Sequence, residues 1–224
     1  MALTLYFHPL SSFCHKVLVA LYENDTPFTG KRVDFADATS AAQLHDLWPM
    51  GKIPVLHDSA RGESIPETSI IIEYLEQHYP GPRPLLPADS NARLQARLWD
   101  RFFDLYVQVP MQKIVADRLR REGGKDVLGV ADAHANLRKA YDMVERQLRD
   151  KPWAIGDTFG LADCAAAPAL FYASIVEPFP GAHVHLGGYF ERLLQRPAFV
   201  RVLDEARPWF DLYPFKEQMP ARFL

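Results

Sequence analysis

The stretch "LTLYFHPLSSFCHKVLVAL", residues 3–21, passes from a strand pattern to a helix pattern within a few residues. Its first part, residues 3–8, alternates and is rich in apolar and aromatic side chains, which is typical of a strand. The apolar residues beyond Ser12 then recur at helical spacing on one face: Phe13, Val17, Ala20 and Leu21. The sequence therefore predicts a strand followed closely by a helix, with two hydroxyls and a thiol where the helix begins.

Alternating strand and helix patterns continue to residue 79. A second strand is expected to end near Val33, and "TSAAQLHDLW" (39–48) predicts a short helix with Thr39 or Ser40 as its N-cap. "KIPVLHD" and "GESIPE" are expected to pair as an antiparallel hairpin, and "ETSIIIEYLEQHY" returns to helical periodicity. The order is β-α-β-α-β-β-α, with a parallel first pair because a helix connects its strands.

The proline-rich segment "YPGPRPLLPADS" (79–90) separates this region from the rest of the chain. Proline lacks a backbone donor and interrupts helices, so residues 80–90 are expected to form a linker. Helical patterns dominate afterwards. The first of these helices carries an apolar residue at every third or fourth position: Leu94, Leu98, Phe102, Leu105 and Val109. We therefore predict an α/β domain over 1–79 and an all-α domain over 91–224.

Composition and charge narrow the class of protein. The formal net charge is −3 and the acids and bases are interspersed, so neither a nucleic-acid partner nor an anionic membrane is expected. The longest nearly apolar run, residues 164–176, is too short to span a bilayer, and the N-terminus lacks the basic region of a signal peptide. Cys14 and Cys164 lie far apart with no CxxC motif, which favours a reducing, cytoplasmic location.

Two short motifs have the chemistry of a peptide-binding site. In "GKIPVLH" (51–57) a residue before proline is extended, so Ile53 can pair its backbone with a peptide, although such strands are also common without a ligand. In "PETS" (66–69) a helix N-terminus and the Thr68 hydroxyl suit a carboxylate, while Glu67 suits an ammonium. Simple helix capping is the alternative for this second motif.

In combination, these elements resemble the cytosolic glutathione transferases, of the serine type, over essentially the whole chain. The most specific segments are "SSFCHKV" (11–17), "GKIPVL" (51–56), "PETSIIIEYL" (66–75) and "GLADCAAAPAL" (160–170). The resemblance implies a thioredoxin-like first domain with a cis peptide bond before Pro54, an all-helical second domain, and a homodimer. It also implies glutathione as co-substrate, with no metal.

The resemblance further implies a role for each residue of the glutathione site. The backbone of Ile53 pairs with the cysteinyl part, Glu67 and Thr68 bind the γ-glutamyl group, and Lys52 is a candidate for the glycyl carboxylate. Ser11 is expected to donate a hydrogen bond to the sulfur. Ser12 is the second choice, with helix capping as its alternative role, and Cys14 is left open as a redox group.

The electrophile is expected between the two domains. The candidates for its pocket are Trp99, Phe103, Tyr106, Met111, Trp209, Phe210 and Tyr213, although aromatic residues at helical spacing often belong to a core. One departure from the family pattern is Gly160, which stands where a Ser or Thr usually caps the helix, three residues before Asp163.

The predicted function is transfer of the glutathione thiol to a small apolar electrophile. A glutathione-dependent disulfide reductase or peroxidase is the enzymatic alternative, and a non-catalytic binding module is the other. His183 and His185 lack further ligands at metal-site spacing, and no G-x-S-x-G motif indicates a hydrolase.

Overall fold

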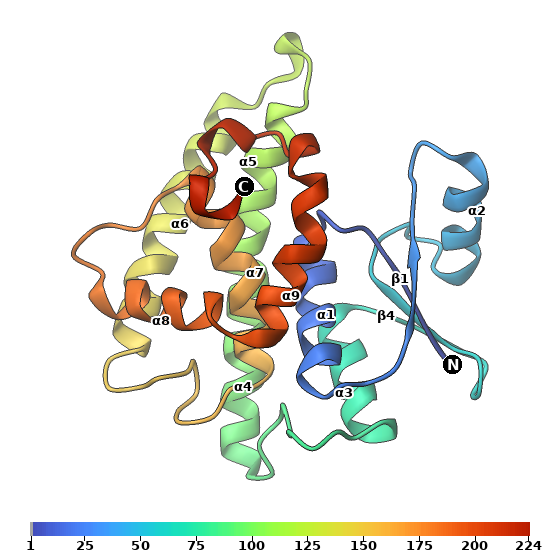
Figure 1. The fold of residues 1–224 in the computed structure, drawn as a ribbon. Coiled ribbons are helices and arrows are strands. Elements are labelled where there is room, and N and C mark those ends of the chain that lie inside the picture. Colours follow the sequence, from blue (N-terminus) through green and yellow to red (C-terminus); the bar gives the residue numbers. More distant parts are fainter. Residues whose placement is uncertain (1) are drawn as a thin grey trace.

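The computed structural model describes residues 2–224. Four strands form one mixed sheet in the order β2–β1–β3–β4 (Figure 1). Their bounds are β1 Leu3–Phe7, β2 Thr29–Arg32, β3 Val55–Asp58 and β4 Glu63–Pro66. β1 runs parallel to β2 and antiparallel to β3, and β3 and β4 form an antiparallel hairpin. The predicted order of elements in the first domain is confirmed.

Helices cover both faces of this sheet. α1 (Ser12–Glu23) and α3 (Thr68–His78) lie between the sheet and the helical domain, and α2 (Ala38–Leu47) lies on the opposite side (Figure 1). Because successive strand residues face opposite sides, Leu56 packs in the main core while Val55 packs against Leu44 of α2. The N-cap of α2 is Asp37, whose carboxylate accepts from the backbone N–H of Ser40 at 2.8 Å, so the prediction of Thr39 or Ser40 is wrong.

The second domain is entirely helical, which confirms the predicted fold class. Its main helices are α4 Ser90–Phe102, the π-helix η1 Phe103–Gln108, α5 Val109–Arg118, α6 Val127–Gln147, α7 Leu161–Val176, α8 Val184–Leu194 and α9 Pro197–Ala206. Short 3₁₀ turns follow α5 and α9: η2 Glu122–Gly124, η3 Arg207–Leu212, η4 Lys216–Gln218 and η5 Ala221–Phe223. α7 is buried along almost its whole length and packs against α1, α4 and η1, so it forms the centre of the molecule.

Gly160 stands at the start of α7 because the linker passes very close to it. A Cβ atom at this position would lie 2.8 Å from the carbonyl oxygen of Leu85, and the N–H of Leu161 donates to that same oxygen at 2.7 Å. The carboxylate of Asp163 accepts from the N–H of Gly160 at 2.9 Å, so this half of a capping pair is present although Gly160 has no hydroxyl for the other half. The departure from the family pattern thus has a steric cause.

A buried group of polar residues, the Lys16 cluster, joins the two domains. The Lys16 ammonium on α1 is fully buried and lies 2.6 Å from Asp100 and 2.7 Å from Asp104. It also donates to the hydroxyl of Ser69 on α3 at 3.1 Å, and Ser69 in turn donates to Asp100 at 2.5 Å. One lysine therefore connects α1 and α3 of the first domain with α4 and η1 of the second.

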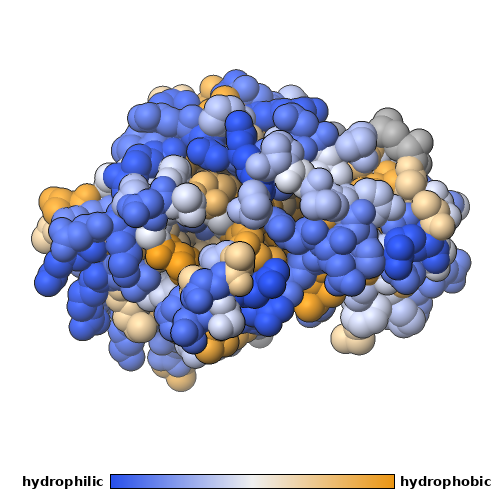
Figure 2. Space-filling view, turned by 90° about the horizontal axis from the view of Figure 1, so that it is seen from below, coloured by the Kyte–Doolittle hydropathy of each residue, from blue (hydrophilic) through white to orange (hydrophobic). Residues whose placement is uncertain are grey.

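The underside of the molecule is mainly hydrophilic, with hydrophobic residues in several separate areas, some of them within a central hollow (Figure 2). Among residues 2–224, no helix combines the length and the apolar character needed to cross a membrane.

Candidate active site

Two adjoining cavities lie between the sheet domain and the helical domain. The small cavity, of about 280 Å³, is lined by Glu67, Thr68, Trp48, Arg101 and Asp104, among others. The large cavity, of about 630 Å³, is lined by Ser11, Ser12, His8, Met111 and Tyr213, among others. Phe13, Lys52, Ile53 and Gln112 line both. The structure thus brings together the six residues that the sequence proposed around glutathione: Ser11, Ser12, Lys52, Ile53, Glu67 and Thr68.

The small cavity is built around two special backbone positions. The Ile53–Pro54 peptide bond is cis, as the resemblance implies, and Ile53 lies immediately before β3. Glu67 has a φ of 68°, a left-handed conformation that costs a non-glycine residue of order 1 kcal/mol or more. This turn begins α3, whose N-terminus has no side-chain cap. The first N–H groups and the positive end of the helix dipole are therefore available to an anion.

Arg101 and Asp104 complete the small cavity from the helical domain, and the sequence did not single them out. The Arg101 guanidinium lies 3.2 Å from Asp104, and burial raises the pKa of Asp104 although Lys16 opposes the rise. Their spacing with Asp100 in "WDRFFD" is the one available signal, since these three charges stand at i, i+1 and i+4 in a helix that is otherwise rich in aromatic residues.

The two serines occupy the N-terminus of α1, beside the large cavity. Ser11 is the N-cap and its hydroxyl oxygen accepts from the N–H of Cys14 at 3.4 Å, whereas Ser12 is the first helical residue and is buried. The capping role proposed for Ser12 therefore belongs to Ser11. Because the Ser11 oxygen is the acceptor in this bond, its hydroxyl proton is still available to a sulfur in the cavity.

Cys14 is fully buried and is not part of the cavity lining. Burial raises the pKa of its thiol to about 12, and the hydrogen bond from Ser11 only partly opposes this rise. Reactive cysteines are partly exposed and have a lowered pKa, because the thiolate is the nucleophile. The surroundings of Cys14 are those of a core residue.

The loop from His8 to Ser11 is held by several hydrogen bonds. The Nε2 atom of His15 on α1 lies 2.5 Å from the carbonyl oxygen of Pro9, and the N–H of Ser11 donates to the carbonyl of His8 at 3.0 Å. His15 is fully buried beside Tyr172, and burial lowers its pKa to about 4. A neutral buried imidazole thus fixes the loop that carries Ser11.

The seven candidates for the electrophile pocket divide into two groups. Met111 and Tyr213 line the large cavity. The remaining five lie elsewhere: Trp99, Phe103 and Phe210 are buried in the core, Tyr106 is 56% exposed on the surface, and Trp209 packs edge-on against His8. The sequence spacing identified helical faces, but it could not show which face meets the first domain.

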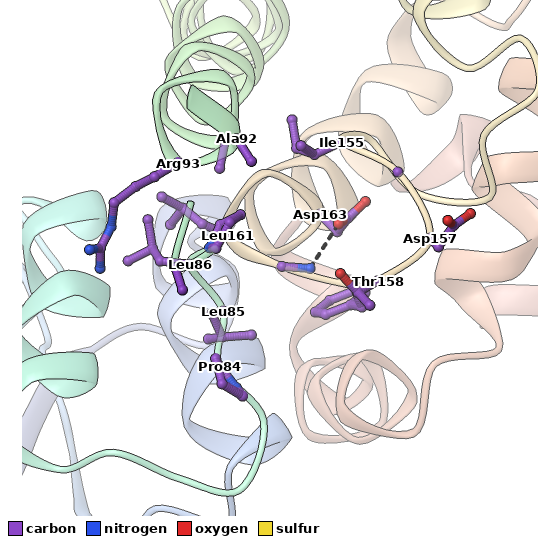
Figure 3. Close-up of a pocket in the computed structure, with 16 residues that line it drawn as sticks. Pro84, Leu85, Leu86, Ala92, Arg93, Ile155, Asp157, Thr158, Leu161 and Asp163 are labelled. Carbon is purple, nitrogen blue, oxygen red and sulfur yellow. Dashed lines mark hydrogen bonds between the residues drawn. The ribbon is translucent and has the colours of Figure 1, made fainter. Parts of the chain in front are cut away.

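A third cavity, of about 680 Å³, lies away from these residues, between the linker, the start of α4 and the loop before α7 (Figure 3). It contains none of the site residues proposed from the sequence. The carboxylate of Asp163, which lines this third cavity, already accepts hydrogen bonds from the N–H of Gly160, the N–H of Ala154 and the hydroxyl of Tyr189. It is not part of the candidate active site.

Metal ligands do not cluster in the part of the chain that the structure describes, residues 2–224: no group of three or more His, Cys, Asp or Glu side chains is placed to hold an ion. His183 lies 3.0 Å from Asp142 in an ion-pair geometry.

Comparison with known proteins identifies the family. The glutathione S-transferase N-terminal domain model matches residues 5–83, and the C-terminal domain model matches residues 105–197. A probable glutathione S-transferase of Nicotiana tabacum is 30% identical over 212 residues, which cover 95% of this chain and 85% of that protein. A stringent starvation protein A homolog of Pasteurella multocida is 27% identical and covers 92% of each chain.

A solved structure agrees with both findings. The glutathione S-transferase of Methylobacterium radiotolerans, crystallised in complex with glutathione sulfonate, matches with a TM-score of 0.78 and 30% identity over 89% of this chain and 93% of its own. Sequence models for both domains, a relative spanning nearly the whole chain and a shared three-dimensional fold lead to one conclusion. This chain belongs to the glutathione S-transferase family.

Proposed function

We propose that this protein transfers the sulfur of glutathione to a small, largely apolar electrophile. The observation that carries the proposal is the continuity of the two cavities. The small cavity offers a peptide-pairing backbone at Ile53 and an uncapped helix N-terminus, and it shares lining residues with the cavity where Ser11 lies. One extended thiol peptide can therefore occupy the small cavity and place its sulfur beside Ser11.

Glutathione fits this arrangement group by group. Its γ-glutamyl carboxylate meets the first N–H groups of α3 and the hydroxyl of Thr68, and its ammonium meets Glu67. The cysteinyl amide pairs with the backbone of Ile53 in the manner of an added strand. Lys52, at the border of the two cavities, is available to the glycyl carboxylate.

Ser11 and the start of α1 make the sulfur reactive. A free thiol has a pKa of about 8.5, so only a few per cent is thiolate at neutral pH. A hydroxyl donor and a helix N-terminus favour the charged form, and lowering the pKa by about one to two units requires roughly 1.4–2.8 kcal/mol. A charge-assisted hydrogen bond together with the helix dipole has this magnitude. The thiolate then forms a bond to carbon as the electrophile loses its leaving group or its double bond.

The test is an ultraviolet titration of glutathione bound to the wild type, Ser11→Ala and Ser12→Ala. We expect a thiolate band near neutral pH in the wild type and in Ser12→Ala, and its loss in Ser11→Ala because that variant lacks the hydroxyl donor. An unchanged titration in Ser11→Ala would refute the role of Ser11.

A non-catalytic member of the family is the second candidate. It is favoured by the similarity to the stringent starvation protein A homolog, whose name does not describe a transferase. The same titration separates the two, because a binding module that has lost the chemistry would show no bound thiolate at neutral pH.

We also propose that the protein works as a homodimer in the cytoplasm. Four apolar residues at helical spacing from α4 to α5 are between 45% and 64% exposed: Leu94, Leu98, Leu105 and Val109. An exposed apolar strip of this kind marks an interaction surface. Leu105 and Val109 also line the small cavity, so a second copy on this strip would border the glutathione site. Two free, buried cysteines fit a reducing compartment.

A further inference from the structure

The third cavity, of about 680 Å³, is larger than either cavity of the proposed glutathione site and shares no lining residue with them (Figure 3). Its walls come from three segments: the linker from Pro84 to Ala88, the first two turns of α4, and the loop that leads into α7. Ligand sites for small molecules commonly range from about 300 to 1,000 Å³, so this cavity has the size of a binding site.

Most of the wall of this cavity is apolar. Three buried leucines, Leu85 and Leu86 of the linker and Leu161 of α7, lie between Arg93 on one side and Thr158 on the other (Figure 3). Further apolar side chains complete the wall: Ala92, Ala96, Ile155 and Phe159. The cavity therefore suits a ligand with an apolar body.

The polar groups of the cavity differ in whether they have partners. The Asp163 carboxylate accepts three hydrogen bonds, and the carbonyl of Leu85 accepts from the N–H of Leu161 at 2.7 Å. In contrast, the Nε atom of Arg93 is buried without a hydrogen-bond partner, and within residues 2–224 its guanidinium forms no ion pair. Native proteins rarely leave a buried donor unpaired, because the lost hydration is not replaced. Arg93 thus lacks an acceptor.

The acidic side chains of neighbouring elements do not supply this acceptor. Glu73 on α3 binds Arg97, which lies one turn after Arg93, and Glu76 accepts from the linker backbone. Asp89, one turn before Arg93, is engaged as the N-cap of α4. A guanidinium presents two parallel N–H groups along one edge, which match the two oxygens of a carboxylate. The missing acceptor of Arg93 is therefore best supplied by an anion from outside the chain.

We propose that the third cavity is a second binding site, separate from the glutathione site, for an apolar carboxylic acid. Its carboxylate accepts from the Nε–H and one terminal N–H of Arg93, and its apolar body lies on the leucines of the linker and α7. Asp157 is exposed at the side opposite Arg93, so a second acidic group there would meet a like charge (Figure 3). The ligand therefore carries one carboxylate. No bond is made or broken, and the proposed transfer of sulfur is not required.

The experiment measures the binding of decanoate and decanol by calorimetry, with S-hexylglutathione in excess so that the cavities of the proposed glutathione site are occupied. We expect the wild type to bind decanoate about tenfold more tightly than decanol, because hydrogen bonds to a charged group are the stronger ones. Both probes have the same apolar chain, so the difference reports the carboxylate.

Three variants locate the site. Arg93→Met keeps an apolar side chain but has no donor, so it should weaken decanoate about tenfold and leave decanol unchanged. Arg97→Met is the matched control, because Arg97 lies one turn away on the same helix, binds Glu73 and does not line the cavity. It should change neither affinity. Ala92→Leu reduces the space in the cavity and should weaken both probes.

Decanoate binding that Arg93→Met leaves unchanged would overturn the inference, as would a wild type that binds decanoate no better than decanol or not at all. Decanoate that binds only without S-hexylglutathione would lie in the glutathione site, which would also overturn it. In each case the proposed transfer of sulfur would stand. A protein that binds no S-hexylglutathione would contradict the proposed function, while the comparison of Arg93→Met with Arg97→Met would still test this cavity.

A measurement on the wild type guards against variants that fold poorly. In protein with ¹⁵N-labelled arginine, the Nε–H signal of Arg93 is identified by its absence from the spectrum of Arg93→Lys. We expect this signal to shift when decanoate is added and to stay in place when decanol is added. A signal that does not move at saturating decanoate would contradict binding by Arg93.

Discussion

At the scale of single residues, His15 shows how a side chain outside the cavity can set the geometry within it. Its buried imidazole holds the carbonyl of Pro9, and thereby the loop that bears both His8 and Ser11. The sequence placed His15 on the helix but could not show that its ring turns back toward the loop. Ser11 was recognisable from its spacing to Val17, whereas no sequence pattern singled out His8, which also lines the large cavity.

His15 gives a prediction for stability against pH. Its pKa is about 4 in the folded protein and about 6.5 when exposed, so as the pH falls the unfolded chain takes up a proton first. The stability contributed by neutral His15 is therefore complete above pH 6.5 and lost between about 6.5 and 4. This gap corresponds to at most about 3–4 kcal/mol, at about 1.4 kcal/mol for each pH unit.

Urea unfolding of the wild type and His15→Phe at pH 7 and pH 4.5 measures this contribution. We expect the wild type to lose more stability than the variant between the two pH values. Burial also raises the pKa of Asp163 to about 6, which gives a slope of opposite sign in the same range, so the difference between the two proteins is the relevant quantity. Equal pH dependence in both proteins would contradict the assignment.

At the scale of elements, the start of α7 is decided by a close approach and not by capping preference. Serine is a slightly better N-cap than glycine, so capping alone predicts that Gly160→Ser is neutral or stabilising. Because a Cβ atom would lie 2.8 Å from the Leu85 carbonyl, we expect the opposite, a loss of about 1–3 kcal/mol. Urea unfolding at pH 7 measures the difference.

Gly187→Ala is the matched control for this prediction. Gly187 lies inside α8 with no neighbouring atom within 4 Å of its Cβ position, so alanine should be neutral or stabilise by up to about 1 kcal/mol. A Gly160→Ser protein as stable as the wild type would show that the linker moves aside at little cost.

Hydrophobic spacing predicted the helices well but not what covers them. The pattern from Leu94 to Val109 correctly indicated helix, although the structure inserts the π-helix η1 within it. Of its five apolar positions only Phe102 is buried, and the other four are exposed. Periodicity shows which residues share one face of a helix. Whether another element covers that face depends on the tertiary and quaternary structure.

At the scale of the whole molecule, the exposed strip predicts association. Leu98→Glu places a charge at the middle of the strip without touching either cavity, and it should shift the protein from a two-chain to a one-chain mass in light scattering. Leu128→Glu on α6, at a position that is 81% exposed, makes the same chemical change away from the strip and should leave the mass unchanged. A wild-type protein with a one-chain mass would refute the dimer.

The arrangement of the two domains could be expected from the family resemblance and not from local patterns. Strand order and the hairpin follow from alternation and from short connections, because both are local. The position of α7 against α1 depends on contacts between residues about 150 positions apart, which no local pattern contains.

The Lys16 cluster has a consequence for how molecules enter the cleft. Separation of the two domains would remove the buried Lys16 ammonium from the buried carboxylates of Asp100 and Asp104. A buried ion without its partner costs several kcal/mol. We therefore expect the two domains to keep a fixed separation, so that the cleft between them does not open and close by a hinge motion. Phe35, Leu119 and Leu212 line the large cavity while remaining more than half exposed, so a molecule that meets the outer part of this cavity meets apolar side chains.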